Sequence, residues 1–284
     1  MKNARGFTLV EILIALVLFG IVSMALYQLL ISSQRVYQQQ SERVSVNESA
    51  RAAISILPGE IREVSAGGGD IVAMSASALT YKSMQSLYVQ CQPPNAGGLQ
   101  IVLDHNTFFG LQGITAGRDS ILIFAEGDST TRTDDGWLHA DVTATAAGTA
   151  CPGGRPSITV TLSGVTATQL GGVLSGAPVR TFRVGQILLY QDAGGAWWLG
   201  ARQFVNAGAT WGTTQPIVGP MTSTGLAMTY FDESGTATAN TASVARVGIT
   251  VVGQSAQQVR GAGGTTYLLQ NLVTQVAVRN NPLY

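Results

Sequence analysis

The sequence predicts an α+β protein, in which a long N-terminal helix packs on a mainly antiparallel β-sheet domain. From residue 7 to residue 57 there is no proline and one glycine, and the residues favour a helix. After residue 65, short runs of β-branched and apolar residues alternate with Gly, Pro, Asn and Asp, which is typical of strands and turns. Residues 65–284 are numerous enough to form one compact domain with its own core.

The chain begins with a short basic leader and an apolar segment long enough to cross a membrane. The leader, residues 1–6, contains Lys2 and Arg5, and we exclude it from the fold. No residue from Ile12 to Ile31 is charged, and these twenty positions make about 30 Å of helix. We place the membrane span at about residues 7–31. Because the basic residues precede it, we expect the remainder of the chain on the side opposite the cytoplasm.

We expect the helix to continue beyond the membrane, so that the whole helix occupies residues 7–64. Good helix formers dominate residues 36–57, and an apolar stripe at one-face spacing follows. Proline lacks an amide donor, so Pro58-Gly59 should kink or end the helix, with a short continuation to residue 64 as the alternative. The stripe that should dock on the domain contains Ala50, Ile54, Leu57, Ile61 and Val64, and the opposite side contains Glu48, Arg51 and Ser55.

Residues 65–284 are predicted to form the β-rich domain. Asp and Gly at 190–197 and at 231–236 indicate hairpin turns. Residues 127–156 and 206–224 have little periodicity and are predicted to be long surface loops, with short strands inside them as an alternative. The predicted strands are 71–73, 79–81, 87–91, 99–103, 120–125, 137–143, 157–162, 179–191, 196–204, 225–231, 243–252 and 267–279.

Charge and cysteine content narrow the classes of function. Lys+Arg and Asp+Glu are both 16, and loss of the leader leaves the chain slightly acidic. No global basic field exists, which disfavours nucleic acid as a partner. The two cysteines, Cys91 and Cys151, have no CxxC or Cys/His cluster around them, so zinc is not indicated. In an oxidising compartment they would form a disulfide, and two separately buried thiols are the alternative.

The stretch Gly6-Phe7-Thr8-Leu9-Val10-Glu11, followed by the apolar helix, resembles the N-terminus of type IV prepilins and type II secretion pseudopilins. A generic signal anchor would share the leader and the span but not the carboxylate. The resemblance implies that a prepilin peptidase cleaves after Gly6 and that the new N-terminal Phe7 is N-methylated. It also implies that Glu11 pairs with the cationic N-terminus of a neighbouring subunit and sets subunit register. A carboxylate that merely lies near the headgroups is the alternative, since a charge in hydrocarbon costs about 2.5–3.5 kcal/mol.

Further segments resemble PilW-like minor pilins and J-type pseudopilins, namely 49–54, 60–63, 117–120, 226–235 and 276–280. This resemblance implies a structural subunit rather than an enzyme, without a cofactor. It implies a minor pilin in the inner membrane, single-pass, with its C-terminal domain in the periplasm, and later in a pilus or pseudopilus filament. The implied partners are other pilins, the prepilin peptidase and methyltransferase, the pilus assembly platform and membrane lipid. A J-like pseudopilin of type II secretion and a tip adhesin or DNA-uptake pilin are the alternatives.

A catalytic or metal site is disfavoured by the remaining polar residues. No Gly-x-Ser-x-Gly turn frames a serine that His105 or His139 would activate. An acidic segment offers carboxylate oxygens, but it lacks EF-hand spacing, so we predict a solvated loop without a metal. Its acidic residues are Glu126, Asp128, Asp134 and Asp135.

The tryptophans are predicted to serve in packing. Strand alternation places Trp197 and Trp198 on opposite faces of a sheet, so at most one lies in the core. The other, together with Trp211, should lie in an interface or under a loop. An aromatic platform for a glycan or single-stranded DNA is the alternative.

Overall fold

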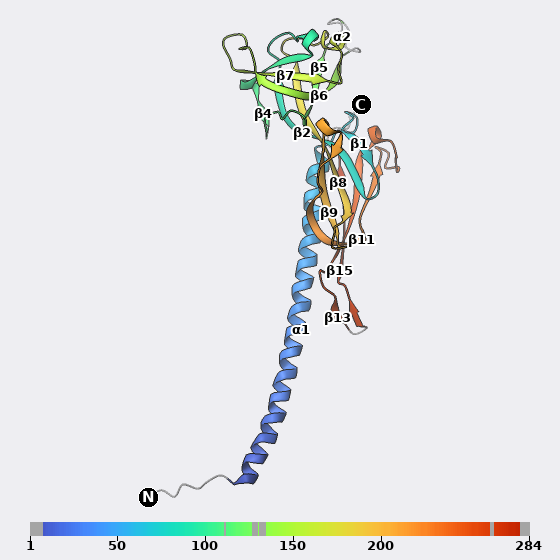
Figure 1. Cartoon of the computed structure of the whole chain (residues 1–284). Helices are drawn as coiled ribbons and strands as arrows, with labels where there is room; N and C mark the ends of the chain where they lie inside the picture. The colour runs from blue at the N-terminus through green and yellow to red at the C-terminus, as the bar shows by residue number, and fades with distance from the viewer. Residues whose placement is uncertain (1–7, 111, 127–129, 131–134, 262–263, 279–284) are drawn as a thin grey trace, which may run out of the picture.

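The computed structural model describes residues 8–110, 112–126, 130, 135–261 and 264–278. A long N-terminal helix packs against a large antiparallel sheet, which confirms the predicted fold class (Figure 1). The helix enters the β domain at one end only, and its N-terminal half extends away from the sheet. The leader and Phe7 lie outside the described residues.

Helix α1 spans Leu9–Arg62 without interruption, a length of 54 residues. Pro58 lies inside it, so the helix does not end at Pro58-Gly59 and instead follows the alternative, a short continuation toward residue 64. The missing amide removes one hydrogen bond of the last turns. Leu57 and Ile61, which flank the proline, are 0 % and 1 % exposed against the sheet. Tertiary packing on both sides of Pro58 therefore stabilises helical backbone that the local sequence disfavours.

The described strands form a 13-stranded sheet and one separate two-stranded hairpin. Every strand pair is antiparallel, and the main path runs β15-β12-β11-β9-β8-β5-β6-β7-β3. The short helix α2 (Ala167–Leu170) follows β7. The strands are β1 (Ile71–Met74), β2 (Ala78–Val89), β3 (Gln100–Asp104), β4 (Phe109–Gly110), β5 (Ser120–Ala125), β6 (Gly136–Ala147), β7 (Ser157–Ser163), β8 (Pro178–Gln191), β9 (Trp197–Val205), β10 (Thr210–Trp211), β11 (Gln215–Phe231), β12 (Arg246–Gln254), β13 (Val259–Gly261), β14 (Gly264–Thr266) and β15 (Leu269–Ala277).

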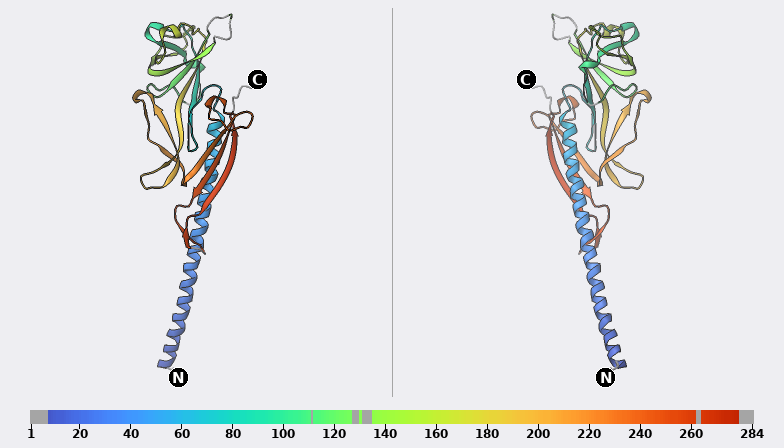
Figure 2. Two further views of the ribbon diagram at one scale, coloured as in Figure 1. Left: turned by 90° about the vertical axis from the view of Figure 1, so that its right-hand side faces the viewer. Right: turned by 90° about the vertical axis from the view of Figure 1, so that its left-hand side faces the viewer.

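The sheet divides into two lobes with separate cores, and strands β2 and β8 belong to both. Residues 185–191 of β8 pair with β9, whereas residues 179–182 pair with β5. The proximal lobe, β1, β9–β12 and β15, lies beside α1, and the distal lobe, β3–β7 and α2, lies beyond its C-terminal end (Figures 1 and 2). The proximal core includes Leu57, Ile61, Leu79, Leu199, Leu226, Ile249 and Val276, and the distal core includes Tyr88, Ile101, Leu103, Ile121, Val160, Leu170 and Val179.

Several boundaries differ from the sequence prediction. Predicted strands 79–81 and 87–91 are one strand, β2, and both predicted hairpin turns are confirmed. Segment 206–224 contains β10 and the first ten residues of β11, which is more strand than was expected there, and in segment 127–156 the strand predicted at 137–143 is extended to form β6. Pro216, Gly219 and Pro220 weaken the strand signal of β11. The strand tolerates them because its pairing with β9 shifts register at two places.

Candidate assembly site

The N-terminal end of α1 is closed by a capping box that joins Thr8 and Glu11. The Glu11 N–H donates to Thr8 Oγ1 over 3.3 Å, and the Glu11 Oε2 accepts from the Thr8 N–H over 2.9 Å. The Thr8 hydroxyl also lies 3.1 Å from Glu11 Oε2. The carboxylate is thereby fixed at the helix start, where two otherwise unpaired amides are satisfied. The spacing Thr-x-x-Glu is a sequence signal for this cap that the sequence analysis missed.

The first half of α1 presents its apolar side chains on every side. Leu9 is 80 % exposed, Phe19 71 % and Leu29 70 %, and the large apolar residues between them are exposed too. Within the described residues, α1 is the one helix that is long and apolar enough to cross a membrane. Glu11 lies in the first turn of this exposed surface. The predicted site residues Gly6 and Phe7 precede it and lie outside the described residues.

The second half of α1 docks on the proximal lobe through a narrow stripe. The buried helix residues are Val46, Ala50, Ala53, Leu57 and Ile61, whereas Glu48, Arg51 and Ser55 are exposed as predicted. Ala53 takes the buried position that was predicted for Ile54, which is half-buried. The sheet approaches closely here, because a Cβ on Gly253 of β12 would lie 3.6 Å from Ala50 Cβ. Small residues on both sides therefore set the distance between helix and sheet.

Polar contacts fix the docked half along its length. The Ser49 hydroxyl donates to the Gly219 carbonyl over 3.3 Å. The Tyr81 hydroxyl of β2 donates to Glu60 Oε2 over 2.8 Å. Burial, followed by the nearby carboxylate of Glu60, raises the pKa of Tyr81, so its hydroxyl remains a donor throughout the physiological range. Asp70, which follows the helix, accepts from the Ser65 N–H over 2.9 Å, and burial raises the pKa of this carboxyl group.

The structure joins Cys91 and Cys151 through a disulfide in the distal lobe. Cys91 follows β2, and Cys151, 60 positions further along the sequence, lies between β6 and β7. Both half-cystines are buried. Beside them, Arg155 Nη1 lies 2.6 Å from Asp104 Oδ2, and that aspartate is 1 % exposed. The disulfide and the ion pair together hold the loop between β6 and β7 to the rest of the lobe.

A buried ion pair that the sequence analysis missed lies where the lobes meet. The guanidinium of Arg183, in β8, is paired with the carboxylate of Asp119, which directly precedes β5. Asp119 Oδ2 also accepts from the Thr115 N–H over 2.6 Å, and Arg183 Nη1 donates to Gln112 Oε1 over 3.0 Å. The two charged residues are 64 positions apart, so no local pattern indicated their contact.

The two histidines lie on different elements. His105 begins the single turn of 3-10 helix that follows β3, and His139 lies in β6, 3.9 Å from Asp141. Burial lowers the pKa of His139, opposed by Asp141. Across the described residues there is no group of three or more His, Cys, Asp or Glu side chains that would hold a metal ion. Asp128 and Asp134 of the predicted acidic loop lie outside the described part of the chain.

Trp197, Trp198 and Trp211 take part in packing. Trp197 packs against the proximal core. Trp198 faces the other side of the sheet, covers Gly219 and donates from Nε1 to Asp192 Oδ2 over 2.8 Å. Trp211 lies edge-on to Phe204, and the guanidinium of Arg202 lies 4.7 Å from its ring centroid. Strand alternation therefore separates Trp197 and Trp198 as predicted.

Comparison with known protein families identifies one motif in the chain. Residues 1–27 match the family described as the prokaryotic N-terminal methylation motif. No curated protein and no solved structure matches the chain. The match covers the start of α1 and not the β domain, so the PilW-like and J-type resemblances stay predictions. The motif implies processing by a prepilin peptidase and assembly with pilins, which are structural proteins rather than enzymes. The chain therefore carries the prokaryotic N-terminal methylation motif in residues 1–27, at the start of an exposed apolar helix whose far end is held by a β domain, and in this motif it is similar to type IV pilin-like proteins.

Proposed function

We propose that the chain is a minor pilin, a structural and assembly subunit of a type IV pilus. The prepilin peptidase cleaves it after Gly6, and Phe7 is then N-methylated. The mature chain is held in the inner membrane by α1, with its β domain in the periplasm, until it enters the filament. One observation carries this proposal, namely that the apolar half of α1 is exposed on every side and has a carboxylate in its first turn.

The exposed half of α1 suits both a lipid environment and a bundle formed with the helices of other pilins. In the membrane, lipid tails cover its apolar side chains. In a filament, the same side chains would pack against neighbouring helices. Glu11 is the one charged residue of this half from Thr8 to Ile31. In such a bundle it requires a cationic partner, and the methylated N-terminus of an adjacent subunit supplies one.

The role of Glu11 is tested by comparing Glu11→Val with the native chain in cells that assemble the pilus. The variant should still insert in the membrane and be cleaved after Gly6, because its helix is more apolar than before. It should be depleted in sheared filaments, and Glu11→Asp should recover part of the loss. Glu48→Val, the same change on the exposed side of the docked half, is the matched control. A Glu11→Val chain that enters filaments at the native level would contradict the proposed role.

Cleavage and stoichiometry test the rest of the proposal. Mass spectrometry of the membrane form should find Phe7 as the N-terminal residue, and Gly6→Val should leave the full-length precursor. In sheared pili the chain should be far less abundant than the principal pilin. A chain that is absent from pili but required for protein secretion would instead be a J-like pseudopilin.

A tip adhesin is the second candidate, and a feature of the distal lobe favours it. A groove of about 310 Å³ beside β4 is lined by Met84, Leu87, Phe109 and other residues. Phe109 is 78 % exposed, although it is a large aromatic residue. Apolar surface on one side of the lobe that lies farther from the membrane suits a contact made by a filament tip (Figure 1). Phe109→Ser would abolish adhesion without loss of pili if this candidate is correct.

A further inference from the structure

The β13–β14 hairpin leaves the main sheet and lies against α1 at the end of the β domain nearest to the apolar half of the helix (Figure 1). Two hydrogen bonds fasten it there. The Gln39 side chain donates from Nε2 to the Arg260 carbonyl over 2.5 Å, and Glu42 Oε2 accepts from the Ala256 N–H over 3.1 Å. Val259, between these two points, is 8 % exposed. The hairpin therefore has a fixed height along the helix.

That height is close to the surface of the membrane. The uncharged run ends at Ile31, and Arg35 lies four residues later, about 6 Å further along the helix axis. Gln39, where the hairpin is fastened, lies about 12 Å beyond Ile31 by the same rise. The headgroup layer extends about 5–8 Å outward from the hydrocarbon core on each side. When α1 spans a bilayer, Arg35 thus lies among the headgroups, and the hairpin lies directly above them.

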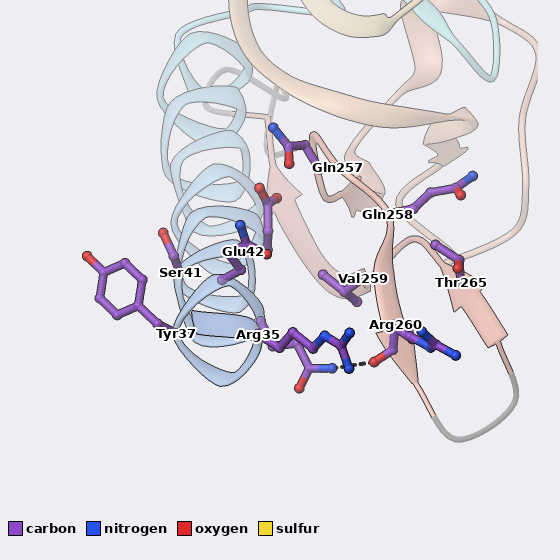
Figure 3. A pocket seen from close by; sticks show the side chains of 11 residues that line it. Arg35, Tyr37, Ser41, Glu42, Gln257, Gln258, Val259, Arg260 and Thr265 are labelled. Atoms are coloured by element: carbon purple, nitrogen blue, oxygen red, sulfur yellow. Dashed lines mark hydrogen bonds between the residues drawn. The ribbon is translucent and has the colours of Figure 1, made fainter. Parts of the chain in front are cut away.

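The surface at this height carries two guanidinium groups and one carboxylate, that of Glu42. Arg35 is the one charged residue from Ile12 to Ser41, and Arg260 is the one charged residue from Ser255 to Thr266. Both arginines line a cavity of about 470 Å³ between the helix and the hairpin (Figure 3). Glu42 lies at the same cavity, but its carboxylate accepts the hydrogen bond from Ala256. Tyr37 is 74 % exposed, which is typical of an aromatic residue at a membrane interface.

We propose that Arg35, Tyr37 and Arg260 form a headgroup contact, which binds the phosphates of membrane phospholipids and holds the β domain against the membrane surface before the chain enters a filament. A guanidinium suits this ligand, because its planar array of N–H donors matches phosphate oxygens. By the same rise, Tyr37 lies about 9 Å beyond Ile31, at the outer side of the headgroup layer. The inference rests on the proposed insertion of α1 in the membrane, but not on cleavage or on filament assembly.

The test uses the full-length chain in lipid nanodiscs whose lipids carry a nitroxide on the headgroup. A fluorophore is attached to Thr265→Cys in the hairpin, and in a separate sample to Thr168→Cys in α2. Both threonines are exposed. The probe on Thr265→Cys should be quenched strongly, whereas the probe on α2, at the far end of the distal lobe, should not be quenched (Figure 1). Equal quenching at the two positions would overturn the proposal.

The role of the arginines is tested by Arg35→Gln combined with Arg260→Gln. Each lost cation should weaken the contact with an anionic bilayer about fivefold, so quenching at Thr265→Cys should fall sharply. Arg51→Gln, the same change on the exposed side of the docked half, should leave quenching unchanged. Full quenching in the double variant would contradict the proposal.

A last comparison separates lipid phosphate from free phosphate. Excess inorganic phosphate, at constant ionic strength, should not reduce quenching in the native chain, because the arginines contact a layer of many headgroups. Complete competition by inorganic phosphate would show a site for the free anion and would refute a lipid contact. Failure of the chain to enter nanodiscs would instead refute the proposed membrane insertion, and flotation of the discs reports this separately.

Discussion

The proximal and distal lobes share strands β2 and β8, but their cores are closed in different ways. The proximal core includes Ala53, Leu57 and Ile61 of α1, so a helix covers one face of its sheet. The distal core contains no residue of α1 and is closed by its own strands and by Leu170 of α2. The disulfide and the Arg155–Asp104 ion pair strengthen this second lobe. The proximal lobe therefore depends on the same helix that anchors the protein, whereas the distal lobe is bound to the helix only through shared strands.

The largest expected effect comes from removal of the docked half of α1. A chain that begins at Tyr37 should be soluble, because it lacks the uncharged run and keeps the buried stripe. A chain that begins at Ser65 should aggregate, since the apolar face of the proximal sheet is uncovered. Size-exclusion chromatography of the two chains makes the comparison. Equal solubility would mean that the helix does not close the proximal core.

Loss of the buried ion pair should affect both lobes, because β8 belongs to both. In Asp119→Ala, Arg183 is left buried and without its carboxylate, and the free energy of unfolding should fall by about 3–5 kcal/mol. Urea denaturation of the chain that begins at Tyr37 measures this change. Asp135→Ala, which removes an exposed carboxylate, is the matched control and should change stability by less than about 0.5 kcal/mol. Similar stabilities of the two variants would show that the pair does not contribute.

Removal of the disulfide should act on the distal lobe alone. Cys91→Ser combined with Cys151→Ser opens a loop of 60 residues, which costs about 4 kcal/mol in the chain-entropy model. Hydrogen exchange should accelerate in β3, β6 and β7, while β12 and β15 keep their protection. Non-reducing peptide mapping of the native chain is the control. Two free thiols in protein from an oxidising compartment would end this prediction.

Two leucines of α1, one in the docked half and one in the exposed half, allow the contribution of each half to stability to be compared. Leu57→Ala leaves a cavity in the proximal core and should lower the free energy of unfolding by about 2–5 kcal/mol. Leu18→Ala changes a side chain that is 58 % exposed and makes no contact with the β domain, so stability of the domain should be unchanged. Denaturation of the full chain in detergent, monitored by tryptophan fluorescence, measures the stability of both variants. Equal losses would mean that the two halves are not in different environments.

The smallest expected effect concerns the hydrogen bond between helix and sheet. Tyr81→Phe removes the donor to Glu60 and should cost about 1 kcal/mol, because the exposed carboxylate is solvated in its place. The half-buried Tyr190 of β8 provides the control change Tyr190→Phe. A Tyr81→Phe chain as stable as the control would show that apolar packing alone fixes the helix.

Local sequence patterns were sufficient to predict the helix, its exposed apolar half and much of the sheet. The uncharged run, the carboxylate at its start and the basic leader follow from residue type and position alone. Strand β5 lies at the predicted residues, and the turns at Asp192 and Asp232 follow from Asp and Gly at their positions. These features depend on neighbours in the sequence, which is why a periodicity or a turn motif predicts them.

Tertiary contacts determined those features of the structure in which residues far apart in the sequence override the local preference of the chain. Helix α1 continues through Pro58 because Leu57 and Ile61 pack on the sheet, and Ala50 is buried where the helix approaches Gly253 of β12 closely. The division into two lobes, the Asp119–Arg183 pair and the placement of the β13–β14 hairpin against α1 join residues 64 to more than 200 positions apart. No local signal specifies such contacts, because their free energy arises only when the folded chain removes both partners from water.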